Sequence, residues 1–287
     1  MKPAPFKYMS PNTVSEVLEA LGRYGEDCKL LAGGQSLIPM LGMRLHRPSV
    51  LVDLNRVSEL SKIEQTNGSV RVGAMARHSS VEHSSLVAEK VPLLSQAVPQ
   101  IGHAAIRNRG TMGGSLVHNH PASELPAVAA ALEAELTVQS SSGERTLKSE
   151  EFFTSYLETD LAENELLTSV SFPILGTDWQ TRFLEFSRRV GDFALVGVAV
   201  TTRTESGRCA EGRIALTGVG GIPTRARTAE SLLIDTPLNA EVLGRVSEAV
   251  QGEVEPLSDF HGSSDYRRHL CGVLVQRALA SMSEGSA

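Results

Sequence analysis

Residues 29–36 of this chain have the sequence KLLAGGQS, in which an apolar run meets a pair of glycines. The run Lys29–Ala32 predicts a buried strand, and Gly33–Gly34 predicts its end. Ser36 could cap a short helix, because a serine hydroxyl can accept a hydrogen bond from the first helical turn. A second apolar run, Val50–Leu54, predicts the next strand. Together these segments predict a strand–helix–strand unit of about 50 residues.

A second glycine pair lies in the segment Thr111-Met112-Gly113-Gly114-Ser115. Backbone without a Cβ atom can approach a ligand closely, and consecutive N–H groups at the start of a helix suit a phosphate. The hydroxyls of Ser36, Thr111 and Ser115 would add donors. A single Gly-Gly pair is usually only a turn. Two pairs of the same small-Gly-Gly-polar character indicate a diphosphate cradle with two walls.

The remaining periodicity predicts an α+β chain. In the middle of the chain we expect a helix with a capping box at Ser79–Glu82, an Ala/Leu-rich helix at 122–134, and strands at 70–74, 135–138 and 167–172. Beyond residues 176–178 the sequence predicts three strands and then three helices, at 183–188, 193–202, 213–219, 225–233, 240–250 and 266–282. Strands followed by helices are typical of a separate α+β domain.

Composition and charge exclude several classes of protein. Hydrophobic residues make up 41% of the 287, enough for a sizeable core, and the net charge of −6 argues against nucleic-acid binding by bulk charge. No apolar run approaches the roughly 18 to 20 residues of a membrane span, and Met1–Phe6 lacks the pattern of a secretory signal. Cys28, Cys209 and Cys271 are far apart, which favours a reducing, cytoplasmic location. Without a Cys-x-x-Cys, we expect neither an iron–sulfur cluster nor structural zinc on this chain.

Common cofactor and hydrolase motifs are missing from the sequence. Residues 218–223 break the dinucleotide fingerprint, because Pro223 stands where the third glycine should be. There is no Gly-Lys-Ser/Thr, no Gly-x-Ser-x-Gly and no His-Glu-x-x-His. Standard nicotinamide, ATP, hydrolase and zinc-protease sites are therefore disfavoured.

Several polar residues near the second glycine pair have more than one reading. His118, His120 and Glu124 could be metal ligands, contacts to a bound ligand, or simply a polar loop before a helix, and the polar loop is favoured. Arg107 and Arg109 could form a solvated face, balance phosphate charge or pair with another subunit.

Three segments, in order, resemble one known family: Ala32–Ser36, Ile106–Ser115 and Ser123–Pro126 are similar to the FAD-binding medium subunits of molybdenum hydroxylases, the xanthine oxidase family. This family includes the flavoprotein subunits of carbon monoxide dehydrogenase, quinoline oxidoreductase and bacterial nicotine or ketone dehydrogenases. The likeness continues through Arg188–Val196 and Asp265–Leu270, and so covers essentially the whole chain.

The resemblance implies a fold and a set of binding residues. The fold is a vanillyl-alcohol-oxidase-type FAD-binding domain of two subdomains, 1–58 and 59–175, followed by a C-terminal α+β domain, 176–287, with a three-stranded sheet and helices. The two glycine segments would grip the FAD diphosphate from two sides, and Phe193 would stack beside the isoalloxazine ring. Glu124, His120 and Ser115 depart from residues common in relatives, which are Asp, Asp and Asn. No catalytic side chain and no metal ligand are implied. The implied cofactor-binding residues are Lys29, Ala32, Gly33, Gly34, Gln35, Ser36, Leu37, Ile101, Gly102, Thr111, Gly113, Gly114, Ser115, Glu124, Asp192 and Phe193.

The resemblance also implies a function. In such enzymes a large subunit hydroxylates substrate at a molybdenum-pterin cofactor, and electrons pass through two 2Fe–2S clusters of a small subunit to FAD on this chain, then to an external acceptor. An (αβγ)2 assembly is implied, without nucleic acid or membrane insertion. The form of the first glycine segment, together with Met1–Pro3, favours relatives that act on N-heterocycles or similar aromatics. A stand-alone flavin oxidase and a flavin-free assembly subunit remain as alternatives.

Overall fold

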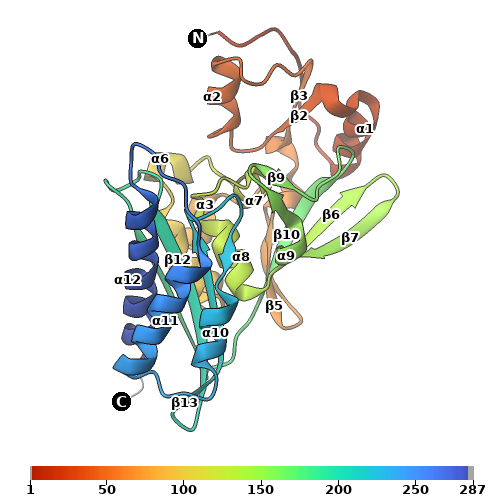
Figure 1. Ribbon diagram of the computed structural model, residues 1–287. Helices are drawn as coiled ribbons and strands as arrows, with labels where there is room; N and C mark the ends of the chain where they lie inside the picture. Colours follow the sequence, from red (N-terminus) through yellow and green to blue (C-terminus); the bar gives the residue numbers. More distant parts are fainter. Residues whose placement is uncertain (1, 284–287) are drawn as a thin grey trace.

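The computed structural model describes residues 2–283, and its N-terminal part forms a small lobe at one end of the molecule (Figure 1). The lobe is a parallel sheet in the order β1-β3-β2 with two helices. The helix α1 begins where the Thr13 hydroxyl accepts a hydrogen bond from the Glu16 N–H, and it buries Val17 and Leu21 against the sheet. The elements of this lobe are β1 (Lys7–Met9), α1 (Val14–Tyr24), β2 (Cys28–Leu31), α2 (Leu37–Gly42) and β3 (Val50–Asp53).

The middle of the chain forms a five-stranded antiparallel sheet in the order β4-β5-β10-β6-β7. Its strands are β4 (Ile63–Thr66), β5 (Ser69–Gly73), β6 (Glu135–Ser140), β7 (Gly143–Lys148) and β10 (Leu166–Pro173). A short hairpin, β8 (Phe153–Ser155) and β9 (Glu158–Thr159), lies outside this sheet. The helices are α3 (His78–Glu82), α4 (Ser85–Lys90), α5 (Pro92–Ala97), α6 (Ala104–Arg107), α7 (Met112–His118), α8 (Glu124–Leu132) and α9 (Ser149–Phe152).

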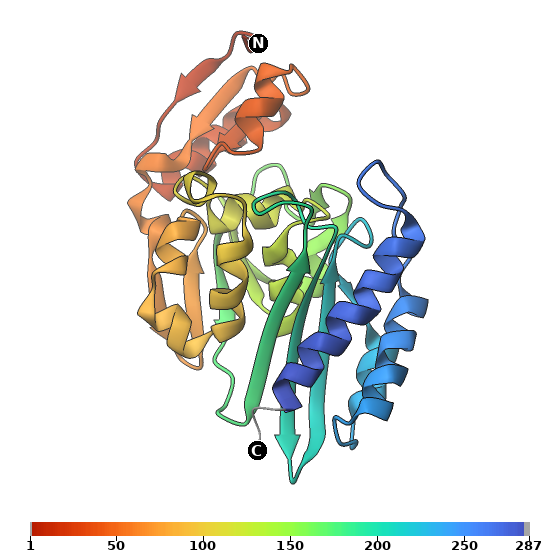
Figure 2. The same ribbon diagram turned by 90° about the vertical axis from the view of Figure 1, so that its left-hand side faces the viewer.

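The last part is a four-stranded antiparallel sheet in the order β11-β12-β13-β14, with three helices over one face (Figure 2). Helix α8 covers the other face, and all nine of its residues are buried between this sheet and the middle part of the chain. A helix that is apolar on every side suits such a central position. The elements are β11 (Trp179–Phe186), β12 (Val196–Glu205), β13 (Arg208–Thr217), β14 (Thr224–Arg225), α10 (Arg227–Leu233), α11 (Ala240–Glu253) and α12 (Ser264–Ser283).

Most expected elements are confirmed, with local corrections. The predicted capping box at Ser79–Glu82 is wrong, because α3 begins at His78 and it is the Ser84 hydroxyl that caps the next helix, α4. The helix expected at 122–134 begins at Glu124. The three C-terminal strands are present, and the short β14 adds a fourth. No helix within residues 2–283 has the length and apolar character needed to cross a membrane.

Candidate functional site

The two glycine segments, far apart in the sequence, touch each other in the structure. The first, which we call loop 1 (Ala32–Ser36), follows β2. The second, loop 2 (Gly110–Ser115), includes the first turn of α7. A Cβ atom added at Gly33 would lie 2.3 Å from the carbonyl oxygen of Arg109 and 2.8 Å from the Cα atom of Gly110. Only glycine permits this backbone contact, so the two loops form adjoining walls.

Loop 1 presents unused backbone donors. The N–H groups of Gly33, Gly34, Gln35 and Ser36 have no acceptor among residues 2–283, and Gly34 has a positive φ of 76°. Successive N–H groups in such a turn, immediately before helix α2, form a nest that suits an anion. A nest beside a second wall is the feature that a dinucleotide diphosphate requires, so these residues fit FAD.

Most N–H groups of loop 2 already donate hydrogen bonds to other groups of this chain. Those of Met112 and Gly113 donate to carbonyl oxygens of the preceding segment Ala74–Ala76, at 2.9 and 2.8 Å. The N–H of Gly114 donates to the Thr111 hydroxyl at 3.1 Å, which caps α7. The expectation that both glycine pairs offer backbone N–H groups therefore holds for loop 1 alone.

Loop 2 carries two side-chain hydroxyls, on the buried Thr111 and the half-buried Ser115. The Thr111 oxygen accepts from Gly114, so its own O–H can still donate. The half-buried Ser115 side chain has no hydrogen-bond partner among the described residues. The two walls thus differ chemically, with backbone amides on loop 1 and side-chain hydroxyls on loop 2.

Loop 2 is held by the segment Ala74–His78, which no motif in the sequence indicated. The N–H of His78 donates to Gly110 and its Nε2 lies 2.9 Å from the carbonyl oxygen of Thr111. Burial lowers the pKa of His78 to about 4, so the ring is neutral at pH 7 and donates from Nε2. The only feature of the sequence that could have indicated this role is a histidine, His78, shortly after the strand β5.

A third segment, at residues 191–193 of the C-terminal domain, packs against His103 and His120. The ring of Phe193 stacks on His120 with centroids 4.3 Å apart, and it remains 66% exposed. A Cβ atom at Gly191 would collide with the ring of His103, which follows Gly102. Phe193 therefore lies outside the core and presents an exposed aromatic ring beside His120.

The other expected binding residues differ in exposure and in the residues they pack against. Ile101 is buried, Gly102 packs on Ile106, and Asp192 is exposed beside Phe193. The Lys29 side chain is exposed on β2 and forms no hydrogen bond or ion pair within residues 2–283, and Leu37 is the first residue of α2.

Glu124 faces a second buried carboxyl group, Glu185 of β11. Glu185 lies opposite Gly197 of β12, which lies opposite Thr217 of β13, and Thr217 donates to the carbonyl oxygen of Ser123 at 2.9 Å. Neighbours in such a row share a face of the sheet. The row therefore places Glu185 beneath the start of α8, where Glu124 is the first residue.

The two carboxyl groups titrate as a pair. Burial raises the pKa of Glu124 to about 7. Burial, and after it the charge of Glu124, raises the pKa of Glu185 to about 8. One carboxylate oxygen of Glu185 is buried without a hydrogen-bond partner among the described residues. The pair therefore retains a proton at neutral pH.

Glu185→Gln should stabilise the protein at alkaline pH and not at acid pH. With a folded pKa of about 8 and an ordinary value of 4.5, Glu185 lowers the free energy of unfolding as pH rises through that interval. Thermal unfolding at pH 8 should occur ~3 °C higher in the variant, with little difference at pH 4.5. The exposed Glu144→Gln variant is the control; an equal rise at both pH values would contradict the assignment.

No metal centre emerges from the histidines near the site. The rings of His118 and His120 stack with centroids 6.1 Å apart. Within residues 2–283, no three His, Cys, Asp or Glu side chains come together as ligands for a metal ion. The ligand-contact and polar-loop readings of this segment remain.

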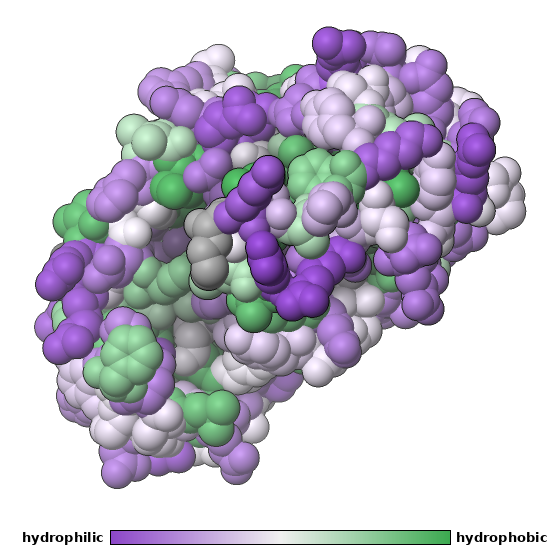
Figure 3. Space-filling view, turned by 90° about the horizontal axis from the view of Figure 1, so that it is seen from above, coloured by the Kyte–Doolittle hydropathy of each residue, from purple (hydrophilic) through white to green (hydrophobic). Residues whose placement is uncertain are grey.

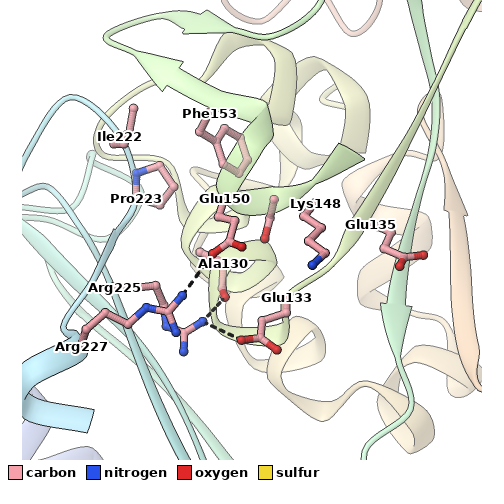
Figure 4. A pocket seen from close by; sticks show the side chains of 11 residues that line it. Ala130, Glu133, Glu135, Lys148, Glu150, Phe153, Ile222, Pro223, Arg225 and Arg227 are labelled. Atoms are coloured by element: carbon pink, nitrogen blue, oxygen red, sulfur yellow. Dashed lines mark hydrogen bonds and ion pairs between the residues drawn. The ribbon is translucent and has the colours of Figure 1, made fainter. Parts of the chain in front are cut away.

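A cavity near the domain junction lies away from the glycine loops. It has a volume of about 460 Å³ and lies between α8, β7 and α9 on one side and β14 and α10 on the other (Figure 4). Three cations line it, Lys148, Arg225 and Arg227, and three glutamates line it as well. Arg225 forms an ion pair with Glu133, and Arg227 forms one with Glu150. Because those charges are balanced, we assign no anion site to it.

Exposed apolar side chains lie on the segments around the loops. Ile38 is 49% exposed, Leu45 66% and Val190 90%. Seen from above, the molecule carries apolar side chains set among polar ones, without one continuous apolar area (Figure 3). A cofactor or a partner subunit could cover such a mixed surface.

Comparison with known proteins identifies the family. Residues 4–175 match the model described as "FAD binding domain in molybdopterin dehydrogenase", and residues 181–282 match "CO dehydrogenase flavoprotein C-terminal domain". The chain is 40% identical to the alpha subunit of the 6-hydroxypseudooxynicotine dehydrogenase complex of Paenarthrobacter nicotinovorans, over 98% of this chain and 95% of that one.

Solved structures agree with the sequence relatives. Quinoline 2-oxidoreductase from Pseudomonas putida 86 superposes with a TM-score of 0.94, at 38% identity and 99% coverage of each chain. Carbon monoxide dehydrogenase from Hydrogenophaga pseudoflava superposes with a TM-score of 0.95, at 35% identity and 98% coverage of each chain. With both of its domains matched in order, the chain belongs to the family of FAD-binding medium subunits of molybdenum hydroxylases.

Proposed function

We propose that this chain carries FAD in a molybdenum hydroxylase, receives electrons from two 2Fe–2S clusters on a small partner subunit, and passes them to an external acceptor. The observation that carries the proposal is the nest of four unused N–H groups in Gly33–Ser36, set against loop 2. Family membership adds the redox role. A bound flavin supplies the exchange between one-electron and two-electron transfer.

The residues of the site have distinct tasks in this proposal. The loop 1 amides bind the diphosphate, and the hydroxyls of Thr111 and Ser115 donate to it from loop 2. Phe193, supported by the ring of His120, presents an aromatic face to the flavin ring. Ile101 and Gly102, with Lys29 and Leu37, line the nucleotide. Asp192 and Glu124 offer carboxyl groups to polar edges of the cofactor.

The assembly and its substrate follow from the same proposal. The large subunit would hold the molybdenum-pterin cofactor, in an (αβγ)2 complex in the cytoplasm; the buried free cysteines support a reducing compartment. The substrate would be an N-heterocycle or a similar aromatic, which the likeness to quinoline 2-oxidoreductase supports. Boundaries at 58/59 and 175/176 fit the separation of the three-, five- and four-stranded sheets.

Co-purification tests the electron-transfer role. We expect the native chain to purify with a molybdenum subunit and an iron–sulfur subunit, and quinoline or a related heterocycle to bleach the flavin only in that complex. A stand-alone oxidase would bleach without partners. A complex without flavin would instead indicate an assembly subunit.

A further inference from the structure

The contact between loops 1 and 2 is held by a pair of side chains, Asn55 and Arg77, that no motif marks. Asn55 follows β3 in the N-terminal lobe, and Arg77 precedes α3 in the middle part of the chain. They lie 22 residues apart and come from opposite sides of the junction between the loops. This pair is called the Asn55–Arg77 bridge below.

Each member of the bridge holds one backbone carbonyl at the loop contact. The Asn55 side-chain N–H donates to the carbonyl oxygen of Ala32 at 3.2 Å. The Arg77 guanidinium donates to the carbonyl oxygen of Arg109, and also to the side-chain oxygen of Asn55. The Arg109 oxygen is the atom against which Gly33 packs. The bridge therefore fixes the carbonyls on both sides of the closest approach between the loops.

The bridge is itself oriented by its neighbours. Asp53 accepts from both the backbone and the side-chain N–H groups of Asn55, which sets the Asn55 amide so that its oxygen faces Arg77. Arg77 forms an isolated antiparallel β-bridge with Thr111 of loop 2. Both side chains are thus anchored to the loops that they connect.

Positive charge accumulates at the bridge without an ion pair. The half-buried Arg77 makes its hydrogen bonds to neutral oxygens, and no carboxylate of the described residues lies within ion-pair distance of it. The pKa of Arg77 is lowered by burial and then by the nearby charge of Arg109, while Asp53 offsets part of this. The exposed Arg109 side chain has no partner among residues 2–283. Two neighbouring cations of this kind are stabilised by an anion.

We propose that Arg77 is a positioning residue for the diphosphate: it locks loop 1 to loop 2 through Asn55 and supplies positive charge behind the nest. This inference rests on the proposed function, because it concerns how the FAD site is built. It predicts that Arg77 and Asn55 act as one unit, so that removing either releases the same contact. It also predicts that the charge of Arg77 and the hydrogen bonds of the bridge contribute separately to the affinity for FAD.

Variants of the full chain separate the two contributions. Relative to wild type, we expect the FAD Kd to rise ~100-fold in Arg77→Gln, which loses charge and both donors, and ~10-fold in Arg77→Lys, which keeps the charge. Asn55→Ala should raise the Kd ~10-fold. In the double variant Asn55→Ala/Arg77→Gln the Kd should equal that of Arg77→Gln, because one bridge is lost in both.

The control is Arg71→Gln, which removes another half-buried guanidinium from the same part of the chain. Arg71 bonds Ser169 at 2.9 Å and touches neither loop, so its FAD Kd should stay within about twofold of wild type. The salt dependence of the FAD Kd should become shallower in Arg77→Gln and stay unchanged in Arg71→Gln.

The readouts are flavin fluorescence on titration of the apoprotein, and thermal unfolding of each apoprotein. A wild-type Kd in Arg77→Gln, or multiplicative effects of Arg77→Gln and Asn55→Ala, would overturn the proposal. If Arg77→Gln does not fold, Arg77→Lys and Asn55→Ala provide the test: a raised FAD Kd in both supports the proposal, and wild-type Kd values in both overturn it. Failure of the wild-type chain to bind FAD would instead overturn the proposed function.

Discussion

Gly33→Ala should release the flavin, with the FAD Kd rising by at least ~100-fold. The added Cβ would lie 2.3 Å from the Arg109 carbonyl oxygen and 2.8 Å from the Gly110 Cα atom, so backbone on both sides has to move. Overpacking of this kind costs about 1 to 3 kcal/mol, and separation of the walls removes loop 1 amides from the diphosphate. The measurement is the ratio of FAD to protein after dialysis, followed by titration with FAD.

A matched glycine in the same lobe serves as the control. Gly22 lies in α1, and a Cβ atom there would meet nothing within 4 Å. Gly22→Ala should keep the wild-type FAD content, since alanine is favoured in a helix. Full flavin content in Gly33→Ala would show that the loop contact does not build the cofactor site.

Arg225→Met should lower the free energy of unfolding by ~3 kcal/mol, the largest stability effect that we expect. Arg225 donates to both carboxylate oxygens of Glu230, at 2.5 and 2.9 Å, and to the carbonyl oxygen of Ala130 in α8 at 3.0 Å. The two charged side chains are only 11% and 9% exposed. Without the guanidinium, the buried carboxylate of Glu230 lacks its main partner, and the Ala130 carbonyl oxygen near the end of α8 loses a hydrogen bond. Arg227, 3.6 Å from Glu230, keeps the loss near the lower end of the range for such pairs.

Two companion variants identify the cause of that loss. Arg208→Met removes an ion pair whose side chains are 52% and 83% exposed, and should cost less than about 1 kcal/mol. The double variant Arg225→Met/Glu230→Gln should recover about half of the loss, because the amide still accepts from the Ile214 N–H without a buried charge. Denaturant unfolding measures all three. An Arg225→Met loss no greater than that of Arg208→Met would contradict the assignment.

The strands, the C-terminal helices and the two glycine loops were predictable from the sequence, because each depends on local pattern. Residues 50–52 and 196–200 are apolar runs, and apolar runs form buried strands. Gly33 and Gly113 indicate close backbone approach through residue type alone. The resemblance then supplied the identity of the ligand, which the glycine pattern limited only to a diphosphate.

The partners of those loops were not predictable, because they depend on contacts between distant segments. Nothing in the local sequence of Asn55 or Arg77 indicates that they meet. The strand β14 was missed because it is only two residues long, too short to show a periodic pattern. The Ser79 capping box failed for a related reason. Hydrogen bonds from His78 to loop 2 set the start of α3, and tertiary contact overrides a local capping signal.

The most direct test of the account is the visible absorbance spectrum of the natively purified chain, with phosphodiesterase treatment of the released chromophore. We predict a flavin spectrum with about one flavin per chain, and release as FAD that phosphodiesterase converts to FMN. Iron–sulfur bands should disappear when partner subunits are removed, while the flavin stays with this chain. A colourless chain in an intact complex would contradict the central claim that Gly33–Ser36 and loop 2 hold FAD.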